Sequence, residues 1–247
     1  MLKKILTVVV SVTVLAGLGV GGYWTYKSPL FTFKKIEFTD YSTNAPFEKE
    51  VILKLLEAPV GQVSLFDLDL TSMEKRVTTH PWIHSVGLSK IFPQTLGVRV
   101  KFRNPIALLE NQGGELSYLD EDAFAFGPFE AKKAANLPVI TGILESDSAQ
   151  LKKVLAFLEN WKASKMRHSG EISSLDYDSE KGFRIMVQFA RSRRTMVELG
   201  HILSQPDDTN MANLSQAIEY LTDKNLAAYQ IFVGDGKKIV VRTSPGS

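Results

Sequence analysis

The chain has 247 residues, of which 44% are hydrophobic and 23% are charged, a composition typical of a globular protein and not of a disordered one. Its 29 Lys and Arg residues exceed its 27 Asp and Glu residues by only two, so the whole chain has no strong electrostatic attraction for nucleic acid. It contains no cysteine, which excludes disulfide frameworks, thiolate nucleophiles and zinc sites with cysteine ligands.

An uncharged apolar run covers residues 5–22, and three aromatic residues follow it: Tyr23, Trp24 and Tyr26. At 1.5 Å per residue such a helix crosses a hydrocarbon core of about 30 Å, and aromatic rings favour its interfaces. The pattern predicts a membrane-spanning helix over residues 5–26, after a head of residues 1–4. A cleaved signal peptide and a buried core helix are the alternatives, although residues 16–19 match a cleavage site poorly.

The charge rule hardly distinguishes the two orientations of this helix in the membrane, because lysines stand on both sides of it: Lys3, Lys4, Lys27, Lys34 and Lys35. A four-residue head with two lysines usually stays in the cytoplasm. We therefore expect the long C-terminal part to be exported.

Residues 31–103 contain five predicted elements. Alternating apolar and polar residues predict a strand over 31–38. Two short amphipathic helices follow, the first capped by Asn44 and the second by Asp69. Two strands joined by a turn around 91–94 complete the unit, so the predicted order is β-α-α-β-β.

The stretch over residues 81–109 resembles the signature of the FtsQ/DivIB family of bacterial cell division proteins. That signature runs Pro-Trp-Val, a strand, Pro-x-Thr-Leu, a strand, then Glu-Arg-x-Pro-x-Ala. The residues on these positions are Pro81, Trp82, Pro93, Thr95, Leu96, Arg103, Pro105 and Ala107. Residues 90–92 replace an arginine-tryptophan cluster, and Phe102 replaces the glutamate. The resemblance implies a POTRA domain over 31–103.

Residues 104–242 are predicted to form a mainly antiparallel β domain with two helices, followed by a tail at 243–247. The first helix has one apolar face, formed by Leu151, Val154, Leu155, Leu158 and Trp161. The second covers 211–224. A closing hairpin is expected at Asp235-Gly236, which lies between two β-rich runs.

The family resemblance continues through this part of the chain. Residues 137–142, LPVITG, match a recurring family segment, and Ala123 stands where a glycine is usual. The predicted fold class is therefore α+β: one N-terminal transmembrane helix, a β-α-α-β-β POTRA domain, and a mainly antiparallel β domain with flanking helices.

The sequence contains no motif that predicts an active site, a metal site or a cofactor site. His80 and His84 have a proline between them, so they cannot present one helical face to a metal ion. The basic run at 191–194 lacks stacking aromatics and is interpreted as a polar turn. Acidic clusters in predicted loops are interpreted as turn and cap residues: 67–69, 120–122 and 207–208.

The last predicted strand, residues 237–242, is the expected binding surface, because a terminal hairpin strand tends to lie at a sheet edge. Its basic residues would favour an acidic partner. A fully paired final strand is the alternative. The residues assigned to the surface are Tyr229, Ile231, Val233, Lys237, Lys238, Ile239, Val240, Val241 and Arg242.

The resemblance also implies a function. In FtsQ-like proteins the C-terminal strand region receives the coiled-coil proteins FtsB and FtsL, and the POTRA domain contributes to recruitment at the septum. We therefore expect a non-enzymatic divisome scaffold in the inner membrane, with a cytoplasmic N-terminus and a periplasmic body, linking early septal-ring components to septal peptidoglycan synthesis.

Two other classes of protein remain as alternatives. POTRA units also occur in outer-membrane assembly and secretion systems, but that class requires a long barrel region of alternating strands after the POTRA domain. A membrane-anchored hydrolase requires a deep pocket with converging polar groups.

Overall fold

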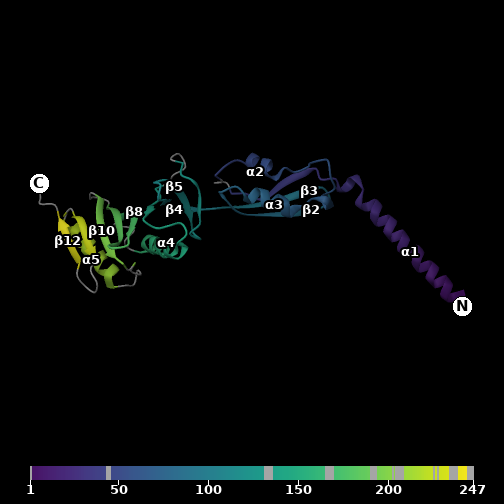
Figure 1. The fold of residues 1–247 in the computed structure, drawn as a ribbon. Coiled ribbons are helices and arrows are strands. Elements are labelled where there is room, and N and C mark those ends of the chain that lie inside the picture. Colours follow the sequence, from purple (N-terminus) through teal and green to yellow (C-terminus); the bar gives the residue numbers. More distant parts are fainter. Residues whose placement is uncertain are drawn as a thin grey trace. The chain divides into compact units, whose positions relative to one another are not determined.

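The computed structural model describes ten stretches of the chain (Figure 1): residues 2–42, 46–130, 136–164, 170–189, 194–201, 203, 209–224, 226, 228–233 and 239–243. The chain divides into two compact units, Met1–Arg103 and Asn104–Ser247. Each unit contains its own cluster of buried hydrophobic residues. The two units are therefore described separately.

The first unit begins with helix α1, Leu2–Tyr26, which has 25 residues. The side chains of residues 10–24 are exposed. In the described part of the chain, no helix combines the length and the apolar character needed to cross a membrane. A short 3-10 turn, η1 (Pro29–Phe31), follows α1.

The rest of the first unit has the predicted β-α-α-β-β order. Its elements are β1 (Lys35–Asp40), α2 (Lys49–Leu56), α3 (Leu70–Thr78), β2 (Ile83–Ile91) and β3 (Thr95–Phe102). Strand β3 is central, parallel to β1 and antiparallel to β2. The helices bury apolar residues against the sheet in one core, which includes Ile52, Leu56, Met73, Val77, Leu96 and Val98. The predicted order of elements is thus confirmed.

The N-terminal cap predicted for α3 is confirmed. The Asp69 carboxylate accepts hydrogen bonds from the Ser72 hydroxyl (2.6 Å) and the Ser72 backbone N–H (3.1 Å). These bonds favour the ionised carboxylate and lower the pKa of Asp69 below its ordinary value. A capping aspartate of this kind satisfies a backbone donor that the first helical turn leaves free.

The predicted start of α2 is wrong. The helix begins at Lys49, with Glu48 as its N-cap and no side-chain capping bond, so Pro46 precedes the helix. The Phe47 carbonyl accepts a hydrogen bond from the Tyr41 hydroxyl (2.7 Å), which holds this segment by a tertiary contact. The predicted cap, Asn44, lies outside the described residues.

The second unit is built on one nine-stranded sheet, in the order β12-β11-β10-β9-β8-β7-β4-β5-β6. Its strands are β4 (Pro105–Glu110), β5 (Leu116–Asp120), β6 (Ala125–Pro128), β7 (Val139–Thr141), β8 (Gly170–Asp178), β9 (Gly182–Phe189), β10 (Arg194–Gly200), β11 (Ala228–Val233) and β12 (Ile239–Thr243). Five of the eight pairings between these described strands are antiparallel, which confirms the mainly antiparallel prediction.

The second unit also contains two helices, α4 (Ser148–Ala163) and α5 (Thr209–Asp223), which are labelled in Figure 1. Both supply apolar residues to the core of this sheet. All five residues of the predicted apolar face of α4 are buried. They join alternate residues of the strands, such as Leu175, Ile185 and Val197. One face of the sheet is therefore occupied by the core, as the alternation along its strands requires.

Strand β7 is only three residues long, yet it pairs in parallel with β4 on one side and β8 on the other. Gly142 follows it directly, with a φ of 77°. A Cβ atom at Gly142 would lie 1.9 Å from the carbonyl oxygen of Tyr177, at the end of β8. Glycine is required here both by its backbone conformation and by the close approach of the neighbouring backbone.

Ala123 has a φ of 63°, a left-handed conformation that costs a residue with a Cβ about 1–2 kcal/mol. This is the position where the family resemblance led us to expect glycine. The alanine side chain is 6% exposed and belongs to the core cluster. Burial of one methyl group is worth about 0.8 kcal/mol, so packing offsets part of the backbone strain.

We expect Gly142→Ala to destabilise the second unit far more than Gly200→Ala. Both glycines have positive φ, 77° and 70°, so both substitutions carry the left-handed cost of about 1–2 kcal/mol. A Cβ at Gly200 meets no atom within 4 Å, whereas one at Gly142 overlaps a backbone carbonyl. Denaturant unfolding of the full chain in detergent measures the difference. Equal losses in the two variants would contradict the proposed overlap.

Candidate partner-binding edge

Strand β12 lies at one end of the nine-stranded sheet, where β11 is its neighbour in the described part of the chain. The two strands pair in antiparallel register, with Phe232 opposite Val240 and Gln230 opposite Arg242. Val240 is 55% exposed. The strand therefore combines an end position in the sheet with an accessible side chain, the features that strand addition uses.

Burial divides the residues assigned to the binding surface into two groups. Ile231 is fully buried, and three further residues pack against the core while remaining partly accessible: Val233, Ile239 and Val241. The exposed members are Tyr229, Val240 and Arg242. Lys237 and Lys238 lie outside the described residues. The first group supports the strand, and the second group is presented to solvent.

The exposed face carries a row of polar contacts that crosses three strands. Arg242 donates a hydrogen bond from Nη1 to Oε1 of Gln230 (3.2 Å), and Gln230 donates from Nε2 to Oε1 of Glu198 (2.8 Å). The guanidinium of Arg242 also lies 5.0 Å from the centre of the Phe232 ring. These contacts hold an arginine in place on the edge strand.

The row continues across the sheet. Glu198 is in register with Arg184, which forms an ion pair with Asp176, and Asp176 accepts a hydrogen bond from the Thr141 hydroxyl (2.7 Å). The charged residues of the row therefore alternate in sign, with the neutral Gln230 between Glu198 and Arg242. The sequence prediction identified Arg242 but missed Glu198 and Gln230. Both residues alternate with buried neighbours along their strands, and this alternation could have assigned them to the exposed face from the sequence.

The family-motif residues lie on other elements than the proposed binding edge. Pro81 is exposed, Leu96 is fully buried in β3, and the Phe92–Pro93 peptide bond is cis. The backbone N–H of Arg103 donates to the carbonyl of Trp82 (2.9 Å), which ties the end of β3 to the start of β2. Thr95 begins β3, and Pro105 begins β4 of the second unit.

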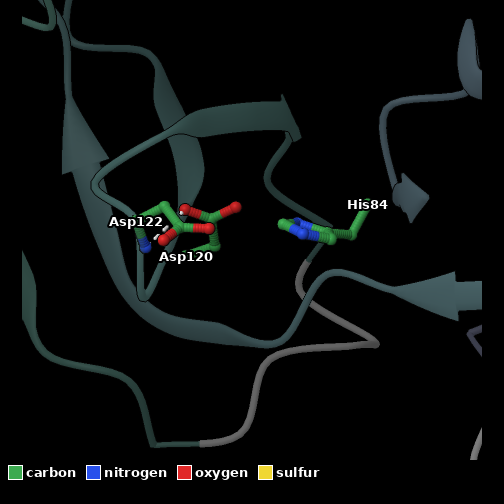
Figure 2. Close-up of side chains that lie close together, drawn as sticks. All are labelled: His84, Asp120 and Asp122. Carbon is green, nitrogen blue, oxygen red and sulfur yellow. Dashed lines mark hydrogen bonds between the residues drawn. The ribbon is translucent and has the colours of Figure 1, made fainter.

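The acidic turn at 120–122 has the structural role predicted for it. Figure 2 shows Asp120 and Asp122 in the turn between β5 and β6, where Oδ1 of Asp120 accepts the backbone N–H of Asp122 (3.0 Å). The same oxygen accepts the N–H of Phe124 (2.9 Å). His84, also labelled in Figure 2, lies on β2 of the first unit. Residues 207–208 lie outside the described residues.

A hollow of about 970 Å³ in the second unit has polar residues in its lining, including Ser117, Ser146, Glu110 and Glu145. Among the residues that the structure describes, its lining contains no histidine. The serines are therefore not accompanied there by the imidazole base that a serine hydrolase uses.

Comparison with known proteins assigns both units. The FtsQ-type POTRA domain model matches residues 31–102, and the model of the cell division protein FtsQ/DivIB C-terminal domain matches residues 107–230. The chain is 29% identical over 208 residues to cell division protein FtsQ of Geotalea daltonii, covering 81% of this chain and 74% of that protein.

Two further relatives carry the same name. FtsQ of Geobacter sp. strain M21 is 29% identical over 195 residues, which cover 75% of this chain and 69% of that protein. FtsQ of Anaeromyxobacter sp. strain K is 32% identical over 184 residues, which cover 70% and 60% respectively. The order of elements, the two domain matches and these relatives agree, and the chain belongs to the FtsQ/DivIB family of bacterial cell division proteins.

Proposed function

We propose that this chain is a single-pass membrane scaffold of the divisome that captures FtsB- and FtsL-type coiled-coil proteins at β12. Through them it links early septal-ring components to septal peptidoglycan synthesis. The observation that carries this proposal is the position of β12 at the end of the sheet in a domain of the FtsQ/DivIB type. Membership of the family supports a role in division.

The proposed topology follows the sequence. Residues 1–4 form a cytoplasmic head, and residues 5–26 cross the inner membrane. The POTRA domain over 31–103 and the β domain over 104–242 lie in the periplasm, with a tail at 243–247. The uncharged run and the aromatic residues after it support the anchor.

Capture at β12 uses two kinds of contact. An incoming strand pairs with the backbone groups on the outer side of β12, which supplies affinity with little dependence on sequence. Arg242, held by Gln230 and placed near the Phe232 ring, supplies a fixed positive charge for an acidic side chain of the partner. The fixed position of this charge along β12 then favours one register of the incoming strand over others.

The outer-membrane assembly alternative receives no support from these observations. The region after the POTRA domain matches the FtsQ/DivIB C-terminal model and contains the helices α4 and α5. Transmembrane barrels instead require successive strands of alternating apolar and polar residues that close on themselves.

Depletion of the protein in its source bacterium tests the role in division. We expect cells to elongate without completing septa, and the full chain supplied in trans to restore normal cell length. Cell length is measured by microscopy with a membrane stain. Normal septa and unchanged length after depletion would contradict the proposed function.

We expect Val240→Pro to abolish capture of the periplasmic part of an FtsB-type partner, because proline adds a ring and removes a backbone donor from the edge strand. Binding is measured by pull-down from solubilised membranes. Tyr220→Ala is the matched control, since Tyr220 is similarly exposed (58%) but lies on α5. Capture that survives the proline would count against strand addition.

Charge reversal at the same edge preserves the backbone and tests the side-chain contact. Arg242→Glu should weaken capture of an acidic partner by roughly tenfold or more, which corresponds to about 1.4 kcal/mol. Because the loss is electrostatic, raising the salt concentration should narrow the difference between Arg242→Glu and the unaltered protein. A salt-independent loss would instead indicate that the variant disturbs β12 itself.

A further inference from the structure

An apolar cluster, exposed except for the half-buried Phe31, lies in the first unit beside the end of α1. We call it the aromatic patch: Tyr26, Leu30, Phe31, Phe66, Ile91 and Phe92. Its rings contact one another, with centroids 5.0 Å apart for Phe66 and Phe92 and 5.1 Å apart for Phe31 and Phe66. Tyr26 joins them at 5.8 Å from Phe66.

The aromatic patch is separate from the core of the unit. None of its six residues belongs to the buried cluster or to the partly buried residues packed against that cluster in the described chain. Leu30 is 66% exposed, Phe92 52% and Phe66 40%. On a folded protein, an exposed group of apolar side chains such as this one more often marks an interaction site than a surface that contacts only water.

Four segments bring these residues to one end of the unit: the end of α1, η1, the turn η2 (Leu65–Asp67), and the end of β2 with the turn that follows it. Strands β1 and β3 run in parallel, so the segment before β1 and the turn before β3 lie at the same end of the sheet. The Tyr26 hydroxyl donates a hydrogen bond to the Asp67 carboxylate, which attaches the last residue of α1 to η2. The patch thus begins where α1 ends.

The charges around the aromatic patch favour an anionic surface. Lys90 donates a hydrogen bond to the Phe66 carbonyl (2.7 Å), and Lys27 lies 4.9 Å from the centre of the Tyr23 ring. Lys34 is exposed between η1 and β1. Asp67, the carboxylate within η2, accepts a hydrogen bond from the Tyr26 hydroxyl, and the three lysines outnumber it. Exposed aromatic rings bordered by lysines are typical of segments that bind in the headgroup region of anionic membranes.

We propose that the aromatic patch binds the surface of the bilayer, with its rings among the headgroups and its lysines toward anionic phospholipid. This inference rests on the proposed membrane anchor, because α1 and the patch are continuous in the chain. Contact at both places holds the POTRA domain against the membrane. A protein occupant of the patch is the competing outcome that the experiment below separates from lipid.

The absence of cysteine from the sequence allows single reporters to be placed in the full chain. Three variants each carry one environment-sensitive fluorophore, at Val14→Cys in α1, Ile91→Cys in the patch, or Ser85→Cys on β2 toward its other end. The protein is inserted into vesicles of phosphatidylglycerol and phosphatidylcholine that contain headgroup-proximal nitroxide lipid. Quenching of each fluorophore measures its contact with the bilayer.

We expect quenching at positions 14 and 91 and none at position 85. Quenching at 14 with none at 91 would overturn lipid binding by the patch and leave the anchor intact, as expected if a protein covers the patch. No quenching at 14 would overturn the anchor, and the signal at 91 would then decide separately whether the patch binds lipid.

Substitutions in the patch complete the test. Phe66→Ser with Phe92→Ser should reduce quenching at position 91 to the level at position 85, because the apolar contact is lost. Phe124→Ser removes a ring from the second unit that is as exposed as Phe92 (52%), and it should leave the quenching at position 91 unchanged. Circular dichroism of each variant checks that the fold persists. Equal quenching in phosphatidylcholine alone would overturn the preference for anionic lipid.

Discussion

The nine-stranded sheet is continuous only through β7. Strands β4, β5 and β6 lie on one side of it, and β8 to β12 lie on the other, so three residues, Val139–Thr141, join the two halves. The joint is reinforced by the hydrogen bond from Thr141 to Asp176 and by the close approach of Gly142 to the Tyr177 carbonyl. The location of the proposed partner-binding edge depends on this joint, because β7 pairs with β8 and the strand order from β8 to β11 ends in β12.

Local patterns in the sequence were sufficient for much of the fold. The β-α-α-β-β order, the Asp69 cap and the buried face of α4 all follow from spacing along one segment. The start of α2 was not predictable in this way, since Phe47 is held by Tyr41. The position of β7 between β4 and β8 could not be predicted either, because a three-residue strand is too short to show a periodicity from which its neighbours can be inferred.

The proposed binding edge was likewise predictable only where the information lies within one segment of the chain. A terminal hairpin strand was predicted from the β-rich runs around residues 235–236, and β11 and β12 do pair in antiparallel fashion. The polar row was not predicted, because Glu198, Gln230 and Arg242 lie on three different strands, β10, β11 and β12. Such contacts require knowledge of strand order and register, which alternation along single strands does not contain.

The two ends of the sheet differ in a way that limits assembly. Strand β6, at the end opposite β12, is four residues long and finishes in Pro128, which has no backbone donor. Strand β12 contains no proline. The backbone of β12 is therefore more open to strand addition than that of β6, so the strand addition proposed above would give each copy one partner strand. The same difference opposes the head-to-tail stacking of copies into open filaments.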